Sequence, residues 1–157
     1  MPLYRHFPSK NDLIAAYLER SDRESWEWLD REIRRRKEPR EKLVVAFEPV
    51  AKLATSLRCM GCTFQGRRLS SPDLRHPGRR VALAHKQRIL ERLADLAGQA
   101  GLRAPDRLAA QLLLLMDGAW VANRMFGSHN HAGAVADAAR AIIQSHAAAQ
   151  PGGGRSS

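Results

Sequence analysis

The 157-residue chain has few cysteines, few aromatic residues and no long apolar run. Its two cysteines, Cys59 and Cys62, are too few for the disulfide framework of a small secreted domain. The longest apolar run, from Leu112 to Met116, is far too short to span a bilayer, and no signal peptide follows Met1. These absences predict a soluble cytoplasmic protein without a membrane partner.

Acidic side chains are also scarce, because 16 Asp and Glu stand against 26 Lys and Arg and give a formal net charge of +10. A basic surface is compatible with binding to nucleic acid. However, no aromatic residues interleave the basic clusters at 34–37, 67–68 and 79–80, as a surface that stacks on bases would need. The charge is also explained by the solvated faces of arginine-rich helices, and both interpretations stay open.

The abundant residues favour helices. Hydrophobic residues make up 44% of the chain, which suits a globular fold, and β-branched residues are few beside alanine, leucine, arginine and glutamate. Apolar residues recur every three or four positions, which predicts an all-α protein. The expected long helices cover residues 10–36, 39–57, 79–97, 105–125 and 132–149, with a short helix or turn at 62–65. Pro49 predicts a kink or break in the second of them.

The N-terminal residues and several later segments carry a family resemblance. Residues 3–7 read Leu-Tyr-Arg-His-Phe and stop at Pro8, and Ser9 with Asp12 then forms a close relative of a helix capping box. This junction resembles the exit of the helix-turn-helix and the start of the linking helix in tetracycline-repressor-like (TetR) transcriptional regulators. Four later segments are similar, in the same order, to the effector domain of one TetR subgroup: 61–64, 76–77, 84–86 and 112–120.

The resemblance covers nearly the whole chain and implies a TetR-type C-terminal helical bundle that lacks most of the N-terminal helix-turn-helix. It implies a remnant of the recognition helix and its turn at 1–9, an effector-binding and dimerisation domain at 10–149, and a disordered tail at 150–157. Because the first two helices of the family's DNA-binding unit are absent, operator DNA is expected as a partner only if they are restored.

The function implied by the resemblance is ligand-responsive repression of transcription by a bacterial homodimer. A small-molecule effector, whose identity the sequence does not give, would shift the linking helix and reset the spacing of two recognition helices. Tyr4, His6 and Lys10 take the family positions that contact DNA phosphates; the alternative is local packing of Tyr4 and Phe7 over the hinge.

The helix predicted at 105–125 is apolar on two faces, so we expect it to be buried against its own core and against a partner. The last helix adds a face of small residues that permits close approach of another helix. Together with the resemblance, these patterns predict dimer contacts from Leu112, Leu115, Ala119, Asn123, Ala134, Ala138 and Ile142.

A mostly apolar effector site is expected inside the same domain. His85 lies on the apolar stripe of its helix, where it is either a satisfied core histidine or the polar group that recognises the ligand. We expect ligand contacts from Phe47, Phe64, His85, Met116 and Trp120, each of which has plain core packing as its alternative.

Cys59 and Cys62 have a C-x-x-C spacing that leaves three interpretations open. They are small buried residues, a redox pair, or half of a zinc site completed by His76, His129 or His131. A thiol or metal sensor therefore remains an alternative function, as does a dimerising protein that sequesters relatives without binding DNA. The chain has no phosphate-binding glycine loop, H-E-x-x-H or G-x-S-x-G motif, so we expect neither an enzyme nor a cofactor or metal.

Overall fold

The computed structural model describes residues 7–57, 59, 62–65 and 76–147, and the regular secondary structure among them is helical. The order of the elements is α1 (Lys10–Arg35), α2 (Pro39–Val44), α3 (Glu48–Ala54), η2 (Thr63–Gln65), α4 (Pro77–Gln99), α5 (Pro105–Phe126), η3 (His131–Ala134) and α6 (Val135–Ser145). The all-α fold expected from the sequence is therefore confirmed. Within this described part, no helix has both the length and the hydropathy that a membrane crossing requires.

Helix α1 begins where the capping pattern predicts. The Ser9 hydroxyl accepts a hydrogen bond from the backbone N–H of Asp12 at 3.2 Å, which satisfies one donor of the first turn. Arg34 and Arg35 in the last turn complement the negative end of the helix dipole. The helix ends where Arg36 adopts an extended backbone, one residue before the predicted boundary.

The second predicted helix is two helices, as Pro49 indicates. Helix α2 ends at Val44 and α3 starts at Glu48, so that Pro49 lies in the first turn of α3. At that position the missing N–H of proline has no helical partner to lose, whereas in a continuous helix the ring would clash with the carbonyl of Val45. The break is therefore located just before the proline.

The three C-terminal helices begin and end within a few residues of the predicted bounds. Helix α4 begins at Pro77, two residues early, because the His76 side chain accepts a hydrogen bond from Gly78 N at 3.1 Å and caps it. The last helix begins as the short element η3, capped by Asn130, and α6 ends at Ser145. The whole predicted tail at 150–157, and the last two residues of the predicted helix, lie outside the described residues.

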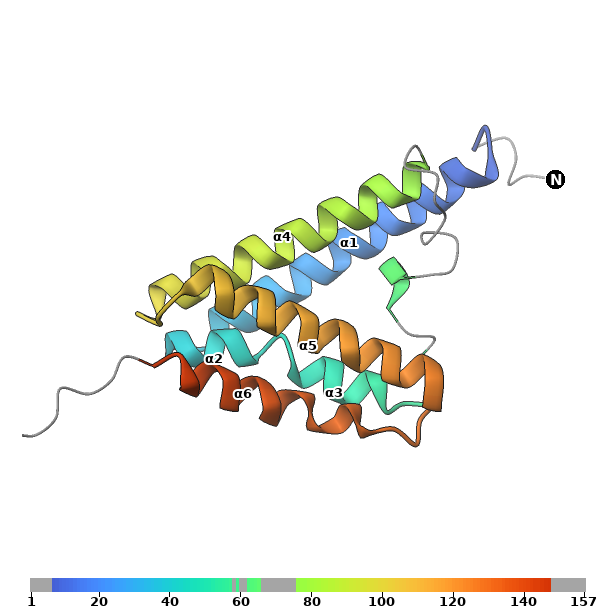
Figure 1. Cartoon of the computed structure of the whole chain (residues 1–157). Coiled ribbons are helices and arrows are strands. Elements are labelled where there is room, and N and C mark those ends of the chain that lie inside the picture. The colour runs from blue at the N-terminus through green and yellow to red at the C-terminus, as the bar shows by residue number, and fades with distance from the viewer. Residues whose placement is uncertain (1–6, 58, 60–61, 66–75, 148–157) are drawn as a thin grey trace, which may run out of the picture.

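Two long helices form one layer of the molecule and shorter ones lie beneath it (Figure 1). Helices α1 and α4 run side by side in the same direction, and α5 packs antiparallel on α4. Helices α3 and α6 pack on the other side of α5, and α2 packs on α4 and α6.

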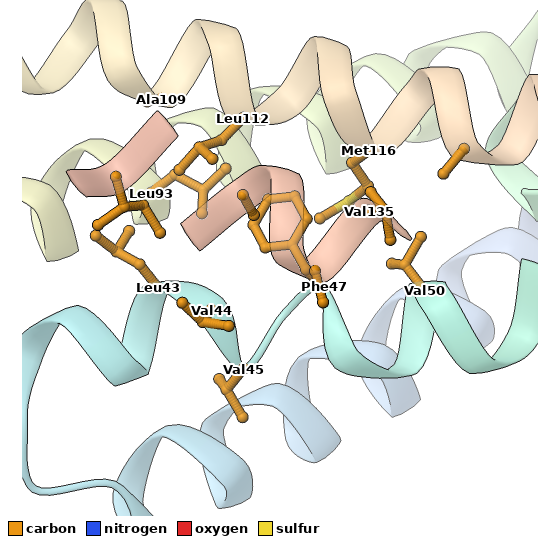
Figure 2. Packing of buried hydrophobic residues seen from close by; sticks show 14 of the residues in the cluster. Leu43, Val44, Val45, Phe47, Val50, Leu93, Ala109, Leu112, Met116 and Val135 are labelled. Atoms are coloured by element: carbon orange, nitrogen blue, oxygen red, sulfur yellow. The ribbon is translucent and has the colours of Figure 1, made fainter. Parts of the chain in front are cut away.

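The main core lies between α2, α3, α4, α5 and α6. Phe47, at the junction of α2 and α3, is fully buried among Leu93, Leu112 and Val135 (Figure 2). A second, smaller cluster forms where α1, η2 and α4 meet, and its buried members are Leu18, Phe64 and Ala82.

Candidate functional site

A large cavity occupies the space between α1, α3, α4, α5 and η2. Its volume is about 940 Å³, at the upper end of the range for sites that hold drug-sized molecules. The lining is mostly apolar, and all three tryptophans of the chain, Trp26, Trp28 and Trp120, contribute to it. Charged residues, among them Glu24, Lys42 and Arg92, also take part.

The structure brings together four of the five residues that were predicted to contact a ligand. Phe64, His85, Met116 and Trp120 all line the cavity. Phe47 does not, because its side chain points from the α2–α3 junction into the main core and is fully buried there (Figure 2). Ligand contact by the four lining residues remains a prediction, while Phe47 is a core residue.

His85 is held in the cavity wall by a buried carboxylate. Its Nδ1 atom lies 2.6 Å from Oδ1 of Asp22 on α1, and both side chains are more than nine-tenths buried. The same oxygen accepts a hydrogen bond from Trp26 Nε1 at 2.9 Å, while Arg88 forms an ion pair with Oδ2. Two helices thus supply three donors to one carboxylate.

Aromatic rings enclose the histidine. The ring of Phe64 stacks on the His85 ring with 3.7 Å between centroids and 12° between planes. Trp26 approaches edge-on, with 6.2 Å between centroids, and the guanidinium of Arg88 lies 5.7 Å from the centre of the Trp26 ring, within cation–π range. The imidazole orientation is therefore fixed by stacking as well as by Asp22.

Burial and hydrogen bonding together set the charges of this pair. Burial alone would raise the pKa of Asp22, but the hydrogen bonds from His85 and Arg88 outweigh it and hold that pKa below its usual value. Burial lowers the pKa of His85, and the favourable contact with Asp22 offsets this only in part. At neutral pH the pair therefore consists of an ionised Asp22 and a neutral His85.

Sequence reasoning missed Asp22, although a signal was present. Asp22 lies four residues after Leu18 and four before Trp26, so it occupies the inward stripe of α1. A carboxylate at such a position needs buried partners. That requirement would have marked it as part of a polar site.

Polar contacts join α1 to α4 along much of their length. Besides the Asp22 cluster, the contacts are Asn11 with His76 at 3.1 Å and Asp30 with Arg92 at 3.1 Å. A further ion pair, between Lys86 and Asp117, joins α4 to α5 beside the cavity. The cavity wall is therefore made of helices that are fastened to one another by specific polar pairs.

Cys59 and Cys62 are half-buried thiols that both line the cavity. Across the described residues, no three His, Cys, Asp or Glu side chains are grouped so that they could hold a metal ion. His76, one of the suggested zinc ligands, instead bonds Asn11 and the backbone of Gly78. The structure thus gives the zinc interpretation no support among these residues.

Of the residues predicted to contact DNA phosphates, only Lys10 falls within the described part of the chain. Tyr4 and His6 lie outside it. Lys10 is exposed and is the first residue of α1. A cation at this position is free to meet a phosphate, but phosphate contact remains a prediction.

The predicted dimer residues of α5 need correction. Leu112, Ala119 and Asn123 are buried inside the chain, and Asn123 Nδ2 donates a hydrogen bond to the Ala54 carbonyl at 2.7 Å. Leu115 is half-buried against the same core. This stripe faces α3 and α6 of its own chain, so its buried members are not available to a partner.

A different face of α5 is open to solvent. It carries Leu114, Val121 and Met125, of which Leu114 and Met125 are 73% and 71% exposed. Their spacings of seven and four place them on one side of the helix. On the C-terminal elements, Ala134 is exposed and Ala138 and Ile142 are half-buried, so these three predicted contacts remain accessible.

Two solved structures resemble this chain along most of its length. One is described as a TetR-transcriptional regulator from Streptomyces avermitilis, with 27% identity and a TM-score of 0.76, over 92% of this chain and 79% of that one. The other is a TetR-family transcriptional regulator from Streptomyces coelicolor, with 26% identity and a TM-score of 0.77, over 92% of this chain and 74% of that one. No protein-family model matches the chain, and no curated protein matches it.

Proposed function

We propose that this chain, which has the fold of the TetR-family transcriptional regulators, carries the effector-binding and dimerisation part of a ligand-responsive repressor. The likeness to two TetR regulators over 92% of the chain confirms the resemblance that the sequence suggested. In this proposal residues 10–149 form the effector-binding and dimerisation domain, and the protein acts in the bacterial cytoplasm.

The observation that carries the proposal is the cavity of about 940 Å³ beside α1. Trp26, Trp28 and Leu29 of α1 line it, so a molecule that fills the cavity must touch this helix. By resemblance, α1 is the helix that links the effector site to the DNA-binding unit. A ligand that prefers one position of α1 therefore shifts the equilibrium between two arrangements of that unit.

In the proposed mechanism two copies act together. A TetR-type dimer places two recognition helices in successive major grooves, and their spacing must match the helical repeat of DNA. Displacement of α1 in each copy changes this spacing and releases the operator. The ligand needs to favour the released arrangement by only a few kcal/mol, which is ordinary for allosteric coupling.

Dimerisation is supported by the exposed row on α5. Leu114, Val121 and Met125 form an apolar stripe that a monomer would leave in water. Elements η3 and α6 pack on α5 and carry the accessible residues Ala134, Ala138 and Ile142. We propose that the partner copy covers these two helices.

DNA captured with the protein tests the proposed function. An affinity tag after Ser157, added at the gene's own place in the genome, isolates the protein with the N-terminus that the cell gives it. Sequencing of the cross-linked DNA is expected to show enriched sites with two related half-sites one or more helical turns apart. No enrichment over a strain whose tag is on an unrelated protein would contradict the proposal.

A further inference from the structure

His85 lines the mainly apolar cavity and has one ring nitrogen that no described residue bonds. Only 8% of its side chain is exposed, and the residue lines the cavity. Nδ1 is occupied by Asp22. Within the described part of the chain, no group forms a hydrogen bond with the other nitrogen, Nε2. Nε2 is not among the side-chain atoms that are fully enclosed without a partner, so water or a ligand can reach it and complete its hydrogen bonding.

The hydrogen bonds of Asp22 determine which nitrogen of His85 carries the proton. An ionised carboxylate can only accept hydrogen bonds, and its Oδ1 lies 2.6 Å from Nδ1. The same oxygen already accepts from the indole N–H of Trp26, which is a donor only. The proton shared with Asp22 must therefore come from Nδ1–H.

The charges around His85 favour its neutral form. The negative charge of Asp22 is already paired with the guanidinium of Arg88. Lys86, on the same helix as His85, adds a positive charge nearby, and Phe64 covers one face of the ring without adding charge. Burial lowers the pKa of His85. A neutral ring with its proton on Nδ1 leaves Nε2 with a lone pair, so Nε2 is a hydrogen-bond acceptor.

We infer that the cavity binds a neutral, mainly apolar molecule that carries a hydroxyl group, and that Nε2 of His85 accepts the hydrogen bond from this hydroxyl. Asp22 is the positioning residue that keeps Nε2 in its accepting form. The inference rests on the proposed ligand-binding function and narrows its ligand to a chemical class, the apolar phenols and alcohols.

Other classes of ligand fit this wall less well. An ether or ketone offers only acceptor atoms, so it would displace water from Nε2 without replacing the hydrogen bond. A carboxylate has no proton to give to Nε2 and would set its own lone pairs against that of Nε2, so Nε2 stays unpaired even where Lys42 or Arg92 of the lining attracts the charge. The hydroxyl is the smallest group that satisfies Nε2 and leaves the remainder of the molecule apolar.

Three matched probes test the inference by isothermal titration calorimetry on the full chain. The probes are 4-phenylphenol, 4-methoxybiphenyl and biphenyl-4-carboxylate, which share one apolar body and differ in the polar group. We expect the phenol to bind about tenfold more tightly than the ether, since one hydrogen bond is at stake. The carboxylate cannot donate to Nε2, so any binding that it gains from the basic lining residues should not depend on Nε2.

Two variants separate the hydrogen bond from the shape of the wall. His85→Phe keeps a ring against Phe64 and removes Nε2, so the phenol and the ether should bind equally. His129→Phe, at an exposed position outside the cavity, is the matched control and should keep the preference of the wild type. A preference for the phenol that persists in His85→Phe overturns the inference.

Asp22→Asn tests the positioning role in a way that a loss of stability would not mimic. With its amide oxygen kept toward Arg88, asparagine places its amide nitrogen where Oδ1 stands and gives up the hydrogen bond from Trp26. The amide then donates to Nδ1, which moves the ring proton to Nε2 and makes that atom a donor. The phenol oxygen and the ether oxygen can both accept from Nε2–H, so the variant should lose the preference for the phenol. Nitrogen-15 NMR of the imidazole checks the tautomers directly: the proton is expected on Nδ1 in the wild type and on Nε2 in Asp22→Asn.

The possible outcomes show separately whether the proposed ligand class or the proposed ligand site is wrong. Equal binding of phenol and ether by the wild type, or a protonated Nε2 in its NMR spectrum, overturns the proposed class while a ligand cavity remains. Binding of none of the three probes overturns both the class and the proposed effector site.

Discussion

At the scale of single residues, the carboxylate of Asp22 is central to the cavity wall. It receives donors from His85, Arg88 and Trp26 and so fastens α1 to α4 from inside the protein. A buried charge is tolerated only when such partners are present, and removal of one partner leaves the others without compensation. The residue therefore connects the stability of the fold with the chemistry of the cavity.

Replacement of Asp22 by alanine should cost far more stability than the loss of an exposed ion pair between the same helices. We expect a loss of about 3 kcal/mol for Asp22→Ala, below the top of the range for buried pairs because Arg88 is half exposed. Asp30→Ala, which removes the exposed pair with Arg92, should cost less than about 1 kcal/mol. Urea unfolding followed by circular dichroism measures both, and equal losses would contradict the buried role of Asp22.

The pH dependence of stability should report the neutral state of His85. Its pKa in the folded chain lies below the ordinary value of 6.5, so the unfolded chain binds the proton more readily. The stability from this group is thus complete above pH 6.5 and is lost as the pH falls toward the folded pKa. The groups that face it are Asp22, Lys86 and Arg88.

Unfolding measured between pH 7.5 and pH 5 should therefore show a smaller acid-induced loss of stability in His85→Phe than in the wild type. His129→Phe is the control and should follow the wild type. A wild-type chain that gains stability on acidification through this range would mean that the folded state favours the imidazolium, contrary to the assignment made here.

At the scale of the elements, helix α5 divides its apolar residues between two environments. Leu112 is fully buried against the main core, and Leu114, two positions later, is 73% exposed. Both are leucines in the middle of one helix, so their intrinsic helix propensities are the same. Leu112 therefore stabilises the fold of the single chain, whereas Leu114 is accessible to a partner.

Alanine substitution should reveal this division. Leu112→Ala removes a core side chain and is expected to cost about 2–5 kcal/mol. Leu114→Ala should change the stability of the monomer by no more than about 0.5 kcal/mol, because its side chain packs on little in its own chain. Thermal or urea unfolding at low protein concentration measures the pair. A large loss at Leu114 and none at Leu112 would reverse the orientation of α5.

Local periodicity was sufficient to predict the helices, because each depends on contacts within a turn or two of the chain. The break before Pro49 and the cap at Ser9 were predicted for the same reason. Phe47 was wrongly expected at the ligand site, since an apolar residue near a helix junction fits a core or a cavity equally well. The partners of Asp22 on α4, His85 and Arg88, are 63 and 66 positions away, so no local pattern reveals them.

The outward face of α5 was also beyond local reasoning. The sequence predicted two apolar faces on this helix, and the structure has a buried one with Leu112 and an exposed one with Leu114. Which of them meets solvent depends on where α3 and α6 pack, and that is a tertiary property. The predicted contacts at Leu112, Ala119 and Asn123 were therefore assigned to the wrong side of the helix.

At the scale of the whole molecule, the proposed dimer should depend on the exposed row of α5. Leu114→Asp places a charge in the middle of that row and is expected to shift a micromolar dimer to monomer with no change in helix content. Leu83→Asp is the matched control, because Leu83 is an exposed leucine on α4. Sedimentation velocity measures both; a wild-type chain that is monomeric at micromolar concentration would contradict the proposed dimer.

The central claim is that a small molecule in the cavity controls release of DNA. The most direct test adds a small-molecule extract of the same cells to the isolated complex of protein and co-purified DNA, and follows the bound DNA by gel shift. We predict that the extract releases DNA from the wild type but not from Ala46→Phe, in which a larger side chain fills part of the cavity. DNA that stays bound to the wild type, or that leaves both proteins equally, would contradict the claim.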